Sequence, residues 1–146
     1  MAPRRYPGWV TDPLRVLVGV DVSTANEMAL RRAAVEARAH GARLEIIHAW
    51  NFLDQPGPEF DPNYGEQAAR ERIDRHVQAT LGPDPGVETE LRMVNDHPAS
   101  ALVAASVGAF TMVVGARGLG GFKGALLGSV SQHVVHHASC PVLVVR

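Results

Sequence analysis

Short apolar runs alternate along the chain with longer segments in which apolar residues recur every three or four positions. Four of the runs are continuous and rich in valine, isoleucine and leucine, which is typical of buried strands, whereas a fifth alternates apolar with charged residues, as a strand at a sheet edge does. The five predicted strands cover residues 14–20, 44–50, 87–94, 111–114 and 142–145. Helical spacing fills the intervals between them and predicts helices over residues 26–41, 66–81, 99–107 and 129–137.

The strict alternation of strand and helix favours an α/β fold in which helices cover both faces of a parallel sheet. Right-handed crossovers leave few arrangements, and the alternating strand 87–94 belongs at an edge. We therefore expect a single-domain, three-layer sandwich whose five-stranded parallel sheet has the order 3-2-1-4-5. The domain is predicted over residues 14–146, after a proline-containing N-terminal arm at residues 1–13.

Composition and charge narrow the class of partner. The 146 residues carry 14 Lys and Arg against 15 Asp and Glu, for a net charge of −1, and only 5% are aromatic. Such a chain lacks the basic surface and stacking platforms of nucleic-acid binders, and no apolar run approaches a membrane span. With a single cysteine and no signal-peptide core at the N-terminus, we expect a cytoplasmic protein that needs no disulfide.

The predicted strand order indicates where a ligand would bind. In a doubly wound sheet, ligands bind beyond the carboxyl ends of the strands at the point where the strand order reverses. In the order 3-2-1-4-5 this point lies between the first and fourth strands. The segments that follow those two strands are Asp21-Val22-Ser23 and a glycine-rich loop that starts at Gly115.

The glycine-rich loop, residues 115–128, suits a phosphate group. Its glycines allow backbone N–H groups to approach an anion, and Ser129 begins the following helix, where unpaired amides and the helix dipole favour phosphate. Ser131 adds a hydroxyl, and Arg117 and Lys123 are the nearby cations. Neither the P-loop motif nor the dinucleotide fingerprint is present, and the alternative interpretation is a plain connector whose glycines only make turns.

Three glycines and a serine in this region form a spaced signature, G-x2-G-x9-G-[ST], at Gly115, Gly118, Gly128 and Ser129. It resembles the signature of the nucleotide-binding branch of the universal stress protein family. The resemblance extends over nearly the whole chain, through VGVDVS, IIHAW and the closing CPVLVV. It implies an α/β sandwich of the order given above, usually dimeric, that binds ATP. Family members without the signature generally do not bind it.

The same resemblance implies which residues contact the nucleotide. Asp21 matches the acidic residue that contacts the nucleotide, and Ala49 matches the position whose backbone addresses the adenine. Because a triphosphate with few cationic partners needs its charge offset, we expect Mg²⁺ to accompany ATP, with Asp21 as its candidate ligand. The full set implied for nucleotide binding is Gly19, Val20, Asp21, Ala49, Val114, Gly115, Arg117, Gly118, Gly128, Ser129, Val130 and Ser131.

Four positions depart from the family pattern. Val22 stands where glycine is common and Ala116 where serine is common, and both are expected near the site, where they could weaken or reshape binding. His97 and Phe110 replace a common glycine and a common aspartate in turns away from the ligand.

Several candidate residues also have ordinary structural interpretations. Asp21 could serve only as a helix cap. His133, His136 and His137 have a spacing compatible with metal ligation, but no carboxylate or cysteine completes the set, and solvated or interface histidines are favoured. His48 is interpreted as a hydrogen-bonded core histidine and Cys140 as a small core residue rather than a reactive thiol. The long loop at residues 51–65 is a candidate flap.

The last strand, Val142 to Val145, is expected at a sheet edge but carries neither the charges nor the prolines that protect an exposed edge. Antiparallel pairing with the same strand of a second copy would satisfy both backbones, so we expect a homodimer through this strand. The resemblance implies a dimer as well.

These features favour an ATP-binding universal stress protein that acts as a dimeric regulatory or stress-response module and is at most a slow ATPase. One alternative is an ATP-hydrolysing or nucleotidyl-transferring enzyme on the same scaffold, but its SGGxDS and HxGH motifs are missing and Asp21 is the only obvious base. The other is a nucleotide-independent interaction protein. The downstream protein partner is not indicated by the sequence.

Overall fold

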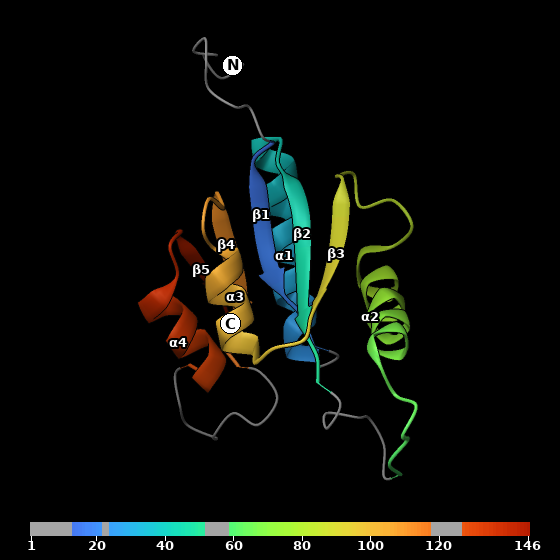
Figure 1. The fold of residues 1–146 in the computed structure, drawn as a ribbon. Coiled ribbons are helices and arrows are strands. Elements are labelled where there is room, and N and C mark those ends of the chain that lie inside the picture. Colours follow the sequence, from blue (N-terminus) through green and yellow to red (C-terminus); the bar gives the residue numbers. More distant parts are fainter. Residues whose placement is uncertain (1–12, 22–23, 52–58, 118–126) are drawn as a thin grey trace.

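Strands and helices alternate along the chain in the order that the apolar pattern predicts (Figure 1). The computed structural model describes residues 13–21, 24–51, 59–117 and 127–146. The elements are β1 (Arg15–Gly19), α1 (Thr24–His40), β2 (Arg43–Ala49), α2 (Glu66–Leu81), β3 (Thr89–Val94), α3 (Pro98–Ala105), β4 (Thr111–Gly115), α4 (Ser129–His137) and β5 (Val142–Val145).

The five strands form one sheet in the order β3-β2-β1-β4-β5, and every neighbouring pair is parallel. The expected α/β fold and its strand order are therefore confirmed. The alternating strand β3 lies at one edge and the apolar strand β5 at the other. Because β4 returns to the far side of β1, the strand order reverses between these two strands.

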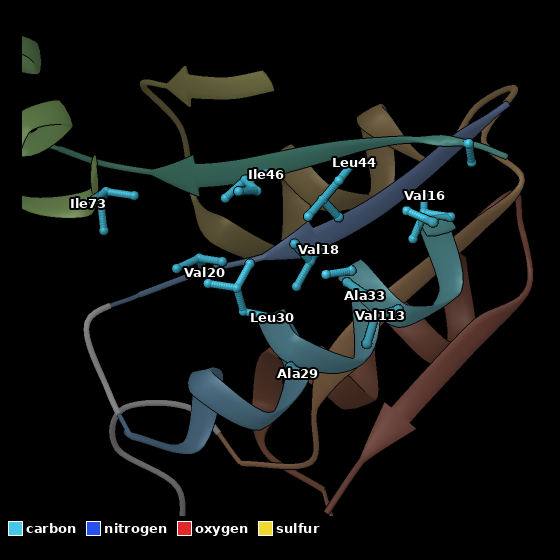
Figure 2. Packing of buried hydrophobic residues seen from close by; sticks show 13 residues of the cluster. Val16, Val18, Val20, Ala29, Leu30, Ala33, Leu44, Ile46, Ile73 and Val113 are labelled. Atoms are coloured by element: carbon cyan, nitrogen blue, oxygen red, sulfur yellow. The ribbon is translucent and has the colours of Figure 1, made fainter. Parts of the chain in front are cut away.

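The helices cover both faces of the sheet, and each face has its own apolar cluster. On one face α1 contributes small residues and one leucine, Leu30, against Val16, Val18 and Ile46, while α2 adds Ile73 (Figure 2). On the other face α3 and α4 pack on the sheet, and this cluster contains Leu17, Ile47, Ala101, Leu102, Met112, Val114 and Val134. Alanines in α1 let the helix approach the strands closely, which is why so few large side chains fill this layer.

Most of the element boundaries differ by one or two residues from those expected, and two of these differences have a visible cause. Helix α3 ends at Ala105 rather than Val107, because Ser106 begins a turn: its amide donates to two carbonyls, and its hydroxyl donates to the Val103 carbonyl at 2.6 Å. Gly108 then takes a positive φ of 73°. Strand β3 begins at Thr89, its first residue in register with β2, although the Leu44 amide already donates to the Glu88 carbonyl at 2.8 Å. Pro98 opens α3 and Gly41 follows α1 with a φ of 61°, both as the sequence indicates.

Some expectations fall on residues that the structure does not describe. The N-terminal arm lies outside the described residues except for Pro13, as do residues 52–58 of the candidate flap and residues 118–126 of the glycine-rich loop. The domain boundary after residue 13 stays a prediction. In the described part of the chain, no helix combines the length and apolar character that crossing a bilayer requires.

Candidate functional site at the reversal of strand order

The two turns expected to form the site leave the sheet at the same edge. Strands β1 and β4 are adjacent and parallel, with Val18 in register with Val113, so their carboxyl ends point the same way. The turn that begins with Val20 and Asp21 therefore starts beside the end of β4 at Gly115. Positions more than ninety residues apart in the sequence meet at this edge because of the strand order alone.

The first turn is fixed by buried polar groups. The Val20 amide donates to the Ile47 carbonyl at 2.9 Å, and the Val20 carbonyl lies 2.7 Å from Nδ1 of His48, a side chain only 5% exposed. Since a carbonyl only accepts, His48 donates from Nδ1, which confirms it as a hydrogen-bonded core histidine. The Asp21 amide donates to Oδ1 of the buried Asn26 at 2.8 Å. These bonds hold the half-buried Asp21 at the end of β1.

The second turn is fixed by bonds that connect α4 to the end of β4. The Ala116 amide donates to the Val145 carbonyl at 2.7 Å, and the Gly128 amide donates back to the Ala116 carbonyl at 2.6 Å. The buried Ser131 hydroxyl donates to the Gly115 carbonyl at 2.5 Å. The start of α4 is thereby placed against the carboxyl end of β4.

The first turn of α4 has donors available for an anion. Gly128 precedes the helix in an extended conformation, with φ −68° and ψ 165°, and has no side-chain cap. Ser129 is exposed and Val130 half-buried, and the amides of a first helical turn lack partners within the helix. Those amides and the positive end of the helix dipole suit phosphate oxygens.

The remaining candidates lie around these turns. Ala49 is half-buried at the end of β2, and Val114 is buried in β4 next to Gly115. Arg117 follows β4 and is exposed, so its guanidinium is open to solvent. Gly118, like Val22, lies outside the described residues. Ala116, the departure expected near the site, is buried and 6% exposed, so a serine hydroxyl there would also be largely shielded from solvent.

Sequence reasoning missed Asn26 as part of this site and did not connect the core histidine His48 with it. Both are buried polar residues whose hydrogen bonds shape the turn at Val20 and Asp21. An asparagine two residues into a helix that follows an acidic turn is a usable signal, because such side chains commonly bond nearby backbone amides. Ser131 has a structural bond to Gly115 in addition to its expected place near the phosphate tail.

Two other candidate features lie apart from these turns. His133 and His137 are exposed on α4 with ring centroids 4.4 Å apart, and no group of three or more potential metal ligands occurs among the described residues. Cys140 packs half-buried against the core, and burial raises the pKa of its thiol above the ordinary 9.0. A thiol with a raised pKa is a poor nucleophile at neutral pH, as expected for a core residue.

The fold and this edge of the sheet define a doubly wound α/β protein with a candidate anion-binding site at the reversal of its strand order. A model of the universal stress protein family matches residues 14–146, and the chain belongs to this family.

Relatives of known sequence and structure agree with this assignment. A universal stress protein of Thermus aquaticus is 38% identical over 138 residues, a match that covers 90% of this chain and 97% of the relative. Universal stress protein Rv2005c of Mycobacterium tuberculosis is 38% identical over 134 residues, covering 90% of this chain and 45% of the relative, so the chain spans about half the length of that protein. The crystal structure of a universal stress protein in complex with cAMP superposes with a TM-score of 0.67 at 32% identity, covering 92% of this chain and 97% of that chain.

Proposed function

We propose that this chain binds ATP at the reversal of strand order and acts as a dimeric regulatory or stress-response module, with at most slow hydrolysis. The observation that carries the proposal is the meeting of two turns at one edge: the acidic turn after β1 lies beside the end of β4, to which α4 is tied by Gly128 and Ser131. A related structure holds cAMP, an adenine nucleotide, which supports this ligand class.

The described residues fit a polyphosphate. The uncapped first turn of α4 offers the amides of Ser129, Val130 and Ser131, and the exposed Ser129 hydroxyl adds another donor. Gly128 has no side chain to block approach to these amides. Arg117 is the exposed cation next to β4.

Asp21 and Ala49 would complete the site. Bound Mg²⁺ would supply positive charge that offsets the triphosphate, and the half-buried Asp21 carboxylate at the end of β1 would hold it. The backbone at Ala49, at the end of β2, would contact the adenine. The bonds from Asn26 and His48 would keep the Asp21 turn in one conformation before the nucleotide binds.

Thermal unfolding with ATP and Mg²⁺ tests the proposal. A ligand that binds only the folded state stabilises it by about 2.7 kcal/mol at a free concentration of about 100 times Kd. For a chain of this size that is roughly a 5–10 °C rise in Tm. The variant Gly128→Val should abolish the rise, because a branched side chain would cover the α4 amides.

Gly65→Val is the matched control, since Gly65 also precedes a helix in an extended conformation without a side-chain cap. It should keep the full rise in Tm. An unchanged melting curve of the natural chain across millimolar ATP would contradict ATP binding and favour a nucleotide-independent interaction protein. Rapid multiple-turnover phosphate release that is lost in Asp21→Asn would instead favour the enzyme.

We also propose that the working unit is a homodimer formed through β5 and that it acts in the cytoplasm. The exposed edge of the sheet at β5 is apolar throughout, and its four residues are only half-buried in the single chain. Pairing with a second copy would cover this edge.

A further inference from the structure

A groove lies between α3 and β3, on the face of the sheet that carries α3 and α4. Helix α3 packs on β1 and β2, whereas the helix that packs on β3 is α2, from the other face. The groove has a volume of about 270 Å³ and, among the described residues, is lined by Arg15, Arg92, Val94, Asp96, Ala101, Ala104, Ala105 and Val107. These residues are distinct from those expected to bind the nucleotide.

A buried carboxylate organises the charged end of the groove. Glu45 in β2 is 1% exposed and forms ion pairs with Arg15 of β1, at 2.9 Å, and with Arg92 of β3. Burial alone would raise the pKa of Glu45, but the hydrogen bonds and charges of the two arginines outweigh it and the pKa lies below its ordinary 4.5. Glu45 is therefore ionised at neutral pH and holds both guanidinium groups in place.

The two arginines differ in the donors that they have left. Arg15 uses its guanidinium on Glu45 and on the carbonyls at the end of α3, donating to Val107 at 2.9 Å and to Ala105 at 3.5 Å. It thus neutralises the negative end of that helix dipole. Arg92 donates to Glu45 through Nη1 alone, its side chain is 46% exposed, and no other acceptor among the described residues takes its hydrogens. A fixed guanidinium with open donors is a ready partner for a planar anion.

Apart from Asp96, the rest of the groove is apolar. Ala101, Ala104 and Ala105 of α3 present only methyl groups, and Val94 of β3 faces them. Asp96 lies beyond Val94, where its Oδ1 accepts the His97 amide at 2.7 Å. An anionic group would avoid Asp96 and move to the arginine end, while a short aliphatic chain would lie along the alanines.

The charge of the cluster selects the ligand class. At the arginine end, two guanidinium groups and the Glu45 carboxylate leave a formal charge of +1, which a monoanion neutralises. Asp96 brings the formal charge of the whole groove to zero, so a phosphate dianion would leave an excess negative charge there. We propose that this groove binds a small aliphatic monocarboxylate, with the carboxylate on the free edge of Arg92 and the chain against the α3 alanines. The site is separate from the proposed nucleotide site and does not depend on it.

Amide chemical-shift titration of the full chain with butyrate tests the proposal, with butyramide as a neutral probe of the same shape. Butyrate should give saturable shifts at Val94, Ala101 and Ala105, and butyramide should bind about tenfold more weakly because it lacks the charge that Arg92 recognises. Two variants should each weaken butyrate by about tenfold: Arg92→Gln, which removes the charge, and Ala104→Met, which fills the groove without touching the ion pairs.

Arg32→Gln is the matched control, because Arg32 is also a half-exposed arginine paired with a glutamate, Glu36, but lies on α1. It should leave butyrate binding unchanged. Absence of saturable shifts at tens of millimolar, equal binding of butyramide, tighter binding of inorganic phosphate, or unchanged binding in Ala104→Met would each overturn the proposal. The rise in Tm with ATP, measured on the same variants, should be unaffected and tests the nucleotide site independently.

Discussion

Single residues set the electrostatics of this molecule, and Glu45 is the clearest case. Its carboxylate is buried in the sheet with a pKa below the ordinary 4.5, because Arg15 and Arg92 favour its charged form more than burial disfavours it. A group whose pKa is lower in the folded state stabilises that state above its unfolded pKa and loses this effect as pH falls through the folded value. The free energy of unfolding should therefore fall at acid pH, as Glu45 becomes protonated.

Glu45→Gln should lower the free energy of unfolding by about 2 kcal/mol at pH 7, because a neutral amide replaces the charged partner of two arginines that stay partly exposed. Urea unfolding of both proteins between pH 7 and pH 3 measures this, and the difference should narrow as pH falls below 4.5. Glu90→Gln, which removes an exposed carboxylate 3.9 Å from Arg43, should cost less than about 0.5 kcal/mol. A loss for Glu45→Gln that does not change with pH would contradict this explanation.

Ser129 and Ser131 have the same side chain and different surroundings. Ser131 is buried and donates to the Gly115 carbonyl. Ser131→Ala should therefore lower the free energy of unfolding by about 1 kcal/mol and also weaken the binding of ATP. Ser129 is exposed, so Ser129→Ala should change the free energy of unfolding by less than about 0.5 kcal/mol. Its effect should be confined to weaker binding of ATP. Chemical denaturation and calorimetric titration separate the two effects. Equal stability losses in both variants would show that Ser131 does not tie α4 to β4.

The sequence predicts residues of the site where a spaced motif exists, and it predicts little about buried polar partners. The glycine signature is what makes Gly115, Gly128 and Ser129 candidates, because such spacing is rare by chance. It gives no sign that Asn26 would bond the Asp21 amide or that Glu45 would sit between two arginines. These contacts depend on which strands are neighbours and on which face each side chain lies, and both are tertiary properties.

At the scale of elements, the hydrophobic pattern predicts the type and order of each strand and helix in the described part of the chain. Strand and helix periods differ, and each apolar run here is short enough to exclude a helix. The ends of the elements are less predictable. Helix α3 ends at a turn in which the Ser106 hydroxyl donates to the Val103 carbonyl, and the same hydroxyl oxygen accepts a hydrogen bond from the Ser139 amide at 2.8 Å. Such a bond between distant segments leaves no trace in local spacing.

The packing of α3 on β1 depends on the absence of a side chain at Gly19. A Cβ there would lie 2.8 Å from a methyl carbon of Leu102, which is closer than real contacts allow. Gly19→Ala should therefore destabilise the chain by about 1–3 kcal/mol as Leu102 is displaced. In a double-mutant cycle, the same substitution should cost less in a Leu102→Val background, where the δ-carbons are gone. Additive effects in denaturant unfolding would show that the close approach is not the cause.

At the scale of the whole molecule, the apolar edge strand β5 would form the interface of the proposed dimer. The Pro141 and Val145 carbonyls accept hydrogen bonds from the amides of Met112 in β4 and of Ala116 just after it. Because the backbone N–H and C=O groups of successive residues in a strand point to opposite sides, the Val144 amide points toward the open edge. Val144→Pro should remove that outward donor and keep the ladder to β4. Light scattering after gel filtration should give twice the chain mass of 15.7 kDa for the natural chain, as for a dimer, and the mass of one chain for the variant.

Leu143→Pro is the contrasting variant for this prediction, because the Leu143 amide faces β4 and its loss should destabilise the chain itself. A monomeric natural chain, or a dimer that survives Val144→Pro with unchanged affinity, would contradict pairing through β5.

The turn after β1 and the start of α4 are proposed to hold one nucleotide between them. The most direct measurement is an amide chemical-shift titration of the natural chain with ATP and Mg²⁺. We expect the amides of Asp21, Gly115 and Ser129 to shift together along one saturation curve with a single Kd, while those of the α3–β3 groove stay in place. Separate curves for the two turns, or no shifts at either, would contradict the claim.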